Sequence, residues 1–232
     1  MNLIHRMALV AVVLAAPAAA VAEDAPIQLK KGDRILFFGD SITEGGGGET
    51  GYITLIKNAL DKQNKDLDIT VINAGKSGHK VPDLQKRVER DVIAKKPTIV
   101  FIYIGINDVW HGQNDPAKGT SKEKFEAGLK EMVSKIEQSG ARVILCTPTV
   151  IGEKKAGGNK LDAKLDEYSD VSRSVAKEMK VPLCDLRKAF VDYLAVNNKD
   201  NKATGVLTGD SVHLNPEGNK RVAETMLKML RE

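Results

Sequence analysis

The run Thr98–Ile104 constrains the fold more than any other stretch of this chain. It reads Thr-Ile-Val-Phe-Ile-Tyr-Ile and has almost no alternation between apolar and polar side chains. A strand with this composition is typical of the middle of a parallel sheet, where helices cover both faces. The run therefore predicts a central strand that is buried on both sides.

Four more apolar runs extend this pattern, at Ile35–Phe38, Ile69–Ile72, Val143–Cys146 and Val181–Cys184. Between the runs, apolar side chains recur at helical spacing. They form three sets: Val81, Leu84, Val88 and Val92; Phe125, Leu129, Met132, Val133 and Ile136; Leu161, Leu165, Tyr168, Val175 and Met179. Alternating strands and helices predict a three-layer α/β/α sandwich with a doubly wound parallel sheet of about five strands.

The first 22 residues have the pattern of a secretory signal peptide. Met1–Arg6 is basic, Met7–Ala22 carries no charge, and the segment ends in Ala20-Val21-Ala22. The apolar part is shorter than the roughly 20 residues of a spanning helix, and an uncleaved anchor is the alternative. We expect cleavage after Ala22, a secreted or periplasmic protein without stable membrane insertion, and one domain over residues 23–232.

Charge and cysteine content exclude several classes of function. The formal net charge is +4 and the basic residues are scattered, which predicts neither a nucleic-acid nor a membrane-binding surface. Cys146 and Cys184 both lie in predicted buried strands, where we expect free thiols rather than a disulfide. The histidines lack the spacing of metal ligands, so we expect no metal.

Four polar motifs lie at the ends of predicted strands or just before the last helix. They are Gly39-Asp40-Ser41, Asn73-Ala74-Gly75-Lys76-Ser77-Gly78, Gly105-Ile106-Asn107-Asp108 and Asp210-Ser211-Val212-His213. The carboxyl ends of parallel strands share one edge of a sheet, so the first three motifs are expected to converge on one crevice.

The fourth motif precedes a clear helix start. Asn215 is a good N-cap, Pro216 suits the first helical position, and Glu217 favours the positive end of the helix dipole. Apolar side chains then give this helix a core face, at Val222, Met226, Met229 and Leu230. The motif is therefore held at the start of a fixed element.

These residue types suit nucleophilic catalysis. A serine hydroxyl needs a base near neutral pH. His213 has a carboxylate, Asp210, three residues earlier on the same short turn, and His111 has Asp108 at the same spacing; we take His213 as the base. Asp210 can hold one ring nitrogen while the other faces Ser41, as in a Ser-His-Asp triad. The backbone N–H groups of Ser41 and Gly78 and the side-chain amide of Asn107 are the candidate oxyanion donors.

In these four blocks, GDSIT, NAGKSG, GIND and DSVHLNPEG, the chain resembles the SGNH hydrolases, or GDSL esterase/lipase family. The Ser, Gly, Asn and His of that name match Ser41, Gly78, Asn107 and His213, and the likeness spans Gly39 to Gly218. It implies a flavodoxin-like strand order and hydrolysis of carboxylic esters without cofactor or metal. The chain departs at His79, where many relatives have an acidic residue.

Several residues near the motifs are possible substrate contacts, namely Asp40, His79, Trp110 and His111. His111 is the main competitor of His213 for the role of base, and Trp110 can equally be a packing residue. We also expect the loops Gly112–Thr120 and Thr149–Asn159 to border the site.

Gly45–Gly48 predicts a mobile lip beside the serine. It does not predict a phosphate-binding loop, because Thr70 stands where the P-loop pattern before Gly75-Lys76-Ser77 needs a glycine. No G-x-S-x-G motif is present, which argues against the α/β-hydrolase architecture.

The sequence thus predicts an exported serine esterase that acts on short acyl esters, with O-acetyl groups on a carbohydrate as the favoured substrate. A lipase or thioesterase-like enzyme for longer acyl chains is the nearest alternative. A carbohydrate-binding module that keeps the fold without turnover is the alternative from another class.

Overall fold

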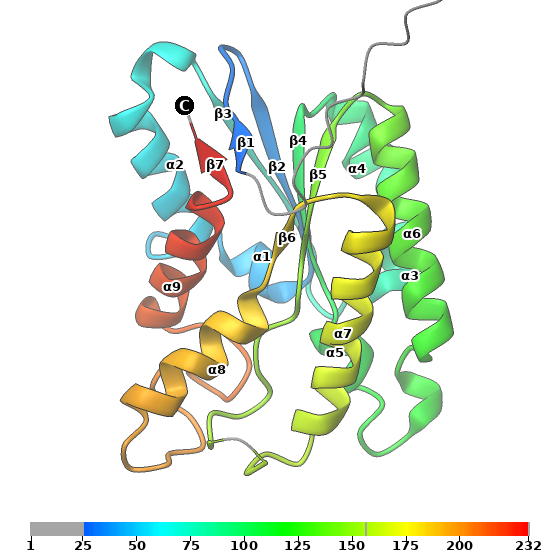
Figure 1. Cartoon of the computed structure of the whole chain (residues 1–232), viewed down its shortest axis with the longest axis vertical. Coiled ribbons are helices and arrows are strands. Elements are labelled where there is room, and N and C mark those ends of the chain that lie inside the picture. Colours follow the sequence, from blue (N-terminus) through cyan, green and yellow to red (C-terminus); the bar gives the residue numbers. More distant parts are fainter. Residues whose placement is uncertain (1–25, 156, 232) are drawn as a thin grey trace, which may run out of the picture.

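The computed structural model describes residues 26–155 and 157–231, so the predicted signal peptide, residues 1–22, lies outside the described residues. Five parallel strands form the central sheet: β2 (Arg34–Gly39), β3 (Thr70–Gly75), β4 (Ile99–Tyr103), β5 (Arg142–Cys146) and β6 (Leu183–Cys184). Their order is β3-β2-β4-β5-β6 (Figure 1), which confirms the doubly wound, flavodoxin-like arrangement.

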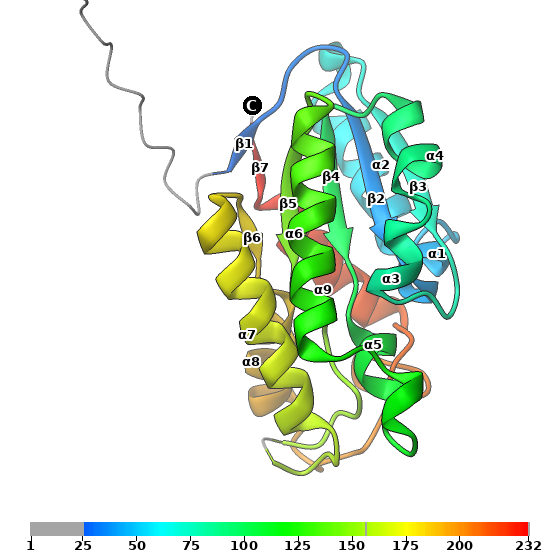
Figure 2. The ribbon, with the colours of Figure 1, turned by 90° about the vertical axis from the view of Figure 1, so that its right-hand side faces the viewer.

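Helices cover both faces of this sheet (Figures 1 and 2). One layer contains α2 (Tyr52–Gln63), α8 (Leu186–Asn197) and α9 (Pro216–Leu227), with α9 packed against both of the others. The opposite layer contains α3 (Val81–Gln85), α4 (Val88–Asp91), α6 (Lys122–Gln138) and α7 (Asp162–Met179). The three layers are those that the alternating sequence pattern predicted.

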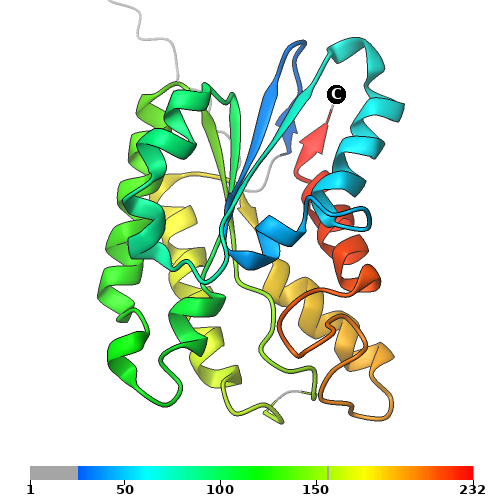
Figure 3. The same ribbon diagram turned by 180° about the vertical axis from the view of Figure 1, so that it is seen from behind.

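Short helical elements complete the connections. They are α1 (Ser41–Gly45), α5 (Ile106–Trp110) and the 3-10 turns η1 (Lys65–Leu67), η2 (Ile93–Lys95) and η3 (Pro116–Lys118). Helices α1 and α5 follow β2 and β4 almost directly and lie at the carboxyl ends of the strands (Figure 3). In the sheet register Gly39 is level with both Gly75 and Tyr103, so these three strands end in one row.

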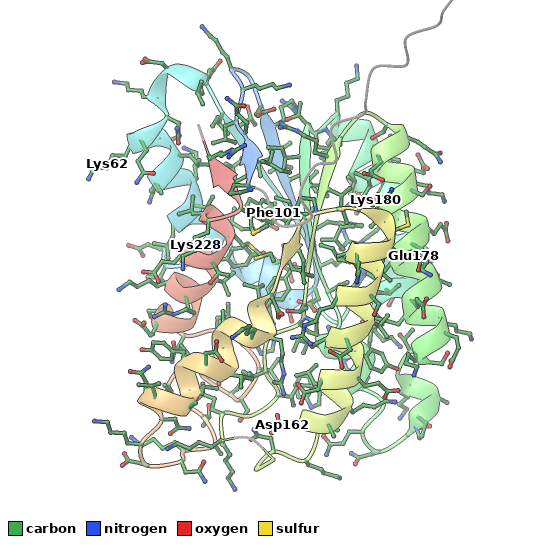
Figure 4. The ribbon with its side chains drawn as sticks, viewed as in Figure 1. Lys62, Phe101, Asp162, Glu178, Lys180 and Lys228 are labelled. Carbon is green, nitrogen blue, oxygen red and sulfur yellow. The ribbon has the colours of Figure 1, made fainter. Side chains whose placement is uncertain are left out.

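The core explains why β4 lies at the centre. Every side chain of β4 is buried, and the Phe101 ring stacks on Phe37 with 5.1 Å between ring centroids. Figure 4 shows Phe101 inside the molecule, whereas Lys62 and Lys228 project from the outer helices. Burial of apolar side chains such as these is the main favourable contribution to folding.

Two sequence-based expectations differ from the structure. Val81, Leu84, Val88 and Val92 are all buried, but they do not share one helix, because Arg87 leaves the helical conformation. Val81 and Leu84 lie on α3, Val88 lies on α4, and Val92 lies between α4 and η2. Helix α9 ends at Leu227, so Met229 and Leu230 are not on it. Leu230 instead belongs to β7 (Leu230–Arg231), which pairs in parallel with β1 (Ile27–Gln28).

Cys146 and Cys184 are neighbours across β5 and β6 and are buried as free thiols, which confirms the expectation. Burial raises the pKa of the Cys146 thiol well above its usual value. Within residues 26–155 and 157–231, no helix has the length and apolar character needed to cross a membrane.

Candidate active site

Ser41 lies where β2 passes into α1. Gly39 is required there because a Cβ atom would stand 2.3 Å from the Tyr103 carbonyl oxygen. The next residue, Asp40, is the N-cap of α1, and its Oδ1 accepts a hydrogen bond from the Ile42 N–H at 3.0 Å. As the first residue of the helix, Ser41 has no preceding turn that could accept its backbone N–H. The hydroxyl and the N–H of Ser41 are thus both presented at the carboxyl edge of the sheet.

The structure brings Ser41, His213 and Asp210 into one hydrogen-bonded line. Ser41 Oγ lies 2.9 Å from His213 Nε2, and His213 Nδ1 lies 2.7 Å from Asp210 Oδ2. With the ring neutral, Nδ1–H donates to the carboxylate and Nε2 is left to accept from the serine hydroxyl. The side chains of His213 and Asp210 are 46% and 55% exposed, so the site is open to solvent.

The turn that carries Asp210 and His213 is closed by its own hydrogen bonds. Asp210 Oδ1 accepts from the backbone N–H groups of Val212 and His213, at 3.0 and 2.7 Å. Thr208 and Leu214 form an antiparallel bridge at its base. Asn215 then caps α9 by accepting from the Gly218 N–H at 3.0 Å, as the sequence predicted.

The candidate oxyanion donors come from three different strand ends. Gly78 has φ = +76°, a left-handed conformation that favours glycine. The Asn107 amide is 3% exposed, and its Nδ2 donates to the His79 carbonyl oxygen at 3.0 Å. This contact uses one N–H of the amide and fixes its orientation, which leaves the second N–H for another acceptor.

A buried arginine ties two of these strand ends together. Arg87 donates through Nη2 to the Gly39 carbonyl oxygen at 2.7 Å and through Nη1 to that of Ala74 at 2.9 Å. Its Nε lies 3.1 Å from His79 Nδ1, which therefore accepts, so that the neutral ring carries its proton on Nε2. The guanidinium also lies over the Phe38 ring, 4.5 Å from the centroid.

The three carboxyl groups at the site differ in pKa. Burial raises the pKa of Asp40 to about 7 and that of Asp108 to about 6. Burial also acts to raise the pKa of Asp210, but the hydrogen bonds from the His213 ring and from two backbone N–H groups outweigh it and lower this pKa. Asp210 is therefore the carboxylate of the site that stays ionised as pH falls.

The four predicted substrate contacts have different surroundings. Asp40 is 2% exposed and caps α1 from within, whereas Trp110 and His111 lie exposed at the end of α5. Burial, and then the charge of Arg87, lower the pKa of His79; burial, and then Lys80, lower that of His111. The histidine that bonds Ser41 is His213 rather than His111.

The glycine cluster and the two loops also have defined places. Gly45 is the last residue of α1, and residues 46–48 follow in the turn before α2. Gly46 is buried there, and a Cβ on it would come within 2.6 Å of the Tyr52 ring. The segment after β5 borders the turn of His213, because the Gly152 N–H donates to the Ser211 carbonyl oxygen at 2.8 Å. The Gly112–Thr120 loop continues from α5, and its Thr120 N–H bonds the Asp108 carbonyl oxygen at 3.0 Å.

Sequence reasoning missed three side chains that hold the site. Asn73 donates to the carbonyl oxygens of Thr43 and Glu44 at the end of α1. Arg87 ties the strand ends, and the buried Glu153 binds the segment before His213. Asn73 is the first residue of the second motif, so the sequence could have identified it. Arg87 and Glu153 belong to no motif. Within residues 26–155 and 157–231, no group of histidine, cysteine and acidic side chains is arranged to hold a metal ion.

Comparison with known proteins gives consistent matches over most of the chain. Residues 37–221 match the model of the GDSL-like lipase/acylhydrolase family. The chain is 33% identical over 219 residues to the acetylxylan esterase of Geobacillus stearothermophilus, covering 87% of this chain and 95% of that enzyme. It is 27% identical over 203 residues to the isoamyl acetate-hydrolyzing esterase 1 homolog of Rattus norvegicus, covering 81% of this chain and 77% of the relative. The crystal structure of the acetyl xylan esterase AlAXEase aligns with a TM-score of 0.80 at 41% identity, over 83% of this chain and 97% of that one.

Proposed function

This chain belongs to the GDSL-like lipase/acylhydrolase family, and we propose that it is an exported serine esterase that removes O-acetyl groups from carbohydrates. Membership makes it a carboxylic ester hydrolase. The observation that carries the proposed mechanism is the line from Ser41 Oγ through the His213 ring to Asp210 Oδ2. Export is supported by the basic start, apolar stretch and small-residue ending of residues 1–22.

Ser41, His213 and Asp210 have distinct chemical roles. Ser41 Oγ attacks the carbonyl carbon of the ester while His213 Nε2 takes the hydroxyl proton. The intermediate collapses, the alcohol leaves with that proton, and the acyl group stays on Ser41. A water that gives its proton to His213 then releases the acid and restores the serine. Asp210 holds the ring in the required tautomer and stabilises the cation that forms.

The negative oxygen of the intermediate needs donors that are in place before the reaction. The N–H groups of Ser41 and Gly78 and the second N–H of the Asn107 amide supply them. Asn107 is suited to this task because its contact with the His79 carbonyl oxygen fixes its orientation in advance. Donors that are fixed in place stabilise the oxyanion more than mobile donors do, since they need no rearrangement when the charge develops.

The acetyl group is the most strongly supported part of the substrate. The Geobacillus and Rattus relatives are named for different alcohols, xylan and isoamyl alcohol, but for the same acid. A carbohydrate as the alcohol is supported by the acetylxylan esterases among the relatives and by the solvent-open position of His213 and Asp210.

Hydrolysis of p-nitrophenyl esters from acetyl to long-chain, by the mature protein and its Ser41→Ala and His213→Ala variants, tests the proposal. We expect fast hydrolysis of the acetyl ester and slower hydrolysis as the acyl chain lengthens. Each variant should lose several orders of magnitude of activity, because the triad acts as a unit. His111→Ala is the matched histidine control and should keep substantial activity. Hydrolysis of acetylated xylo-oligosaccharides then tests whether the alcohol is a carbohydrate. Mass spectrometry of the exported protein tests the predicted cleavage and should find Glu23 as its first residue.

Other outcomes would change the assignment. A preference for long chains would favour a lipase or thioesterase-like enzyme. Loss of activity in His111→Ala with retention of activity in His213→Ala would show that His111, and not His213, is the base. Absence of Ser41-dependent turnover on the esters and the acetylated sugars alike would favour a non-catalytic carbohydrate-binding module.

A further inference from the structure

Glu153 is a fully buried carboxylate whose hydrogen bonds all lead to one segment. Its Oε2 accepts from the Val206 N–H at 2.7 Å, and its Oε1 accepts from the N–H groups of Leu207 and Thr208 at 2.7 and 2.5 Å. The Thr208 hydroxyl donates to the same Oε1 at 2.7 Å. Three consecutive backbone N–H groups and one hydroxyl thus surround a single carboxylate.

The backbone of Glu153 binds the same part of the chain. Its N–H donates to the Ala203 carbonyl oxygen at 3.0 Å, and its own carbonyl oxygen accepts from Asn198 Nδ2 at 2.6 Å. Within residues 26–155 and 157–231, no lysine or arginine forms an ion pair with this carboxylate. A buried carboxylate is costly unless it is well bonded, so these N–H contacts must offset its burial.

The bound segment needs an external partner. Between α8 and α9 the chain has neither helix nor strand, only the isolated bridge of Thr208 and Leu214. Buried backbone N–H groups that lack ladder partners must be satisfied by side chains. The Glu153 carboxylate supplies that partner, and in Figure 3 the segments after β5 and before α9 run side by side.

The connection from Glu153 to His213 is short. Thr208, which Glu153 holds by two bonds, is the first residue of the turn, and its bridge partner Leu214 directly follows His213. The Gly209 N–H donates to the His213 carbonyl oxygen at 2.8 Å. A shift of Thr208 would therefore move Leu214 and the backbone of His213 itself, whose ring bonds Ser41.

We propose that Glu153 is the positioning residue for His213. It does not touch the reacting atoms; it fixes the turn so that Nε2 stays within hydrogen-bond distance of Ser41 Oγ. The inference rests on the proposed function, because it assumes that His213 is the base.

Asp33 provides a matched control for a purely structural effect. It is a buried carboxylate at the opposite, amino-terminal end of the strands, and it accepts from the Lys30 N–H, the Thr98 hydroxyl and Arg142 Nη2 at 2.7, 2.6 and 3.1 Å. Asp33→Asn therefore perturbs a comparable buried network without any link to the turn of His213.

The test compares kcat and KM of Glu153→Gln and Asp33→Asn, at a temperature where both variants are fully folded. In Glu153→Gln one oxygen becomes an NH2 group that faces an N–H donor, so the segment must shift. Because misplacing a reacting group by about 1 Å can cost about 100-fold, we expect kcat to fall roughly 10- to 100-fold with KM nearly unchanged. Asp33→Asn should keep the wild-type kcat. Equal kcat in wild type and Glu153→Gln would overturn the inference.

A double-mutant cycle with His213→Ala separates this inference from the proposed function. If Glu153 acts only through His213, Glu153→Gln should cause no further loss of kcat in the His213→Ala background. The same fold loss in both backgrounds would overturn the positioning role. Full activity of His213→Ala would instead refute the proposed mechanism itself. Should Glu153→Gln fail to fold, Thr208→Val, which removes one of the four bonds, should lower kcat several-fold, and an unchanged kcat would overturn the inference.

Discussion

The nucleophile and the base of this site are held by different kinds of structure. Ser41 lies on a regular strand-to-helix junction, with its neighbour Asp40 buried beneath it. His213 lies on an exposed turn in a segment without helix or strand. Yet each side depends on one buried charged side chain, Arg87 on the nucleophile side and Glu153 on the base side.

The signs of these two charges follow from the kind of backbone group that each side presents. At the carboxyl ends of β2 and β3 these groups are carbonyl oxygens. Arg87, which has only donors, bonds those of Gly39 and Ala74, and the Gly39 oxygen also accepts from the Lys76 N–H at 3.1 Å. In the segment before His213 the unpaired groups are N–H donors, and a carboxylate, which has only acceptors, satisfies them. Each buried charge here completes the backbone hydrogen bonding, and Arg87 in addition forms an ion pair with Asp91 at 3.2 Å.

Removal of Arg87 should have the largest effect on stability. Arg87→Met leaves two buried carbonyl oxygens without charge-assisted bonds, each worth about 1.5–3 kcal/mol, so we expect the free energy of unfolding to fall by roughly 3 kcal/mol or more. Urea unfolding measures this loss. Arg90→Met is the matched control, because Arg90 also pairs with Asp91 but is 72% exposed, and it should cost less than about 1 kcal/mol. Similar losses in the two variants would contradict the assigned role of Arg87.

Arg87 and Glu153 also show which part of the site could not be predicted from the sequence. The structure places Ser41, His213 and Asp210 in one hydrogen-bonded line and Asn215 at the cap of α9. These positions could be predicted because each depends on local patterns, a strand followed by a turn or a three-residue spacing. Arg87 and Glu153 bind partners 48 and 55 residues away in the chain, so no local pattern identifies them. The break of the 81–92 helix at Arg87 and the pairing of Leu230 with Ile27 have the same origin, since both are set by distant contacts.

The two aspartates beside Ser41 and His213 should give stability opposite dependences on pH. Burial raises the pKa of Asp40 to about 7, so the folded protein holds a proton that the unfolded chain has lost, and stability falls as pH rises from about 4 to about 7. A carboxyl whose pKa rises from 3.8 to about 7 is worth at most roughly 4 kcal/mol. Asp40→Asn keeps a capping oxygen without the titration, so its stability relative to wild type should increase over this range.

The variant Asp210→Asn should show the opposite dependence of stability on pH. The pKa of Asp210 is lowered in the folded protein, so its contribution is present above the usual carboxyl pKa and is lost as pH falls through the lowered value. Relative to wild type, this variant should therefore lose stability as pH rises. Unfolding free energies of the three proteins between pH 3 and pH 8 provide the measurement, and the same slope for both variants would contradict the assigned surroundings of the two carboxyl groups.

The smallest expected effect concerns the far end of the turn that carries His213. Asn215→Ala removes the cap of α9, which should cost about 1 kcal/mol of stability. Ser121→Ala, which removes the cap of α6, is the matched control and should cost a similar amount. Because Asn215 follows the turn by two residues, only Asn215→Ala should also lower kcat, by a few-fold. If both variants keep the wild-type kcat, the helix start does not help to place His213, and the ring is positioned by Glu153 together with the hydrogen bonds of the turn itself.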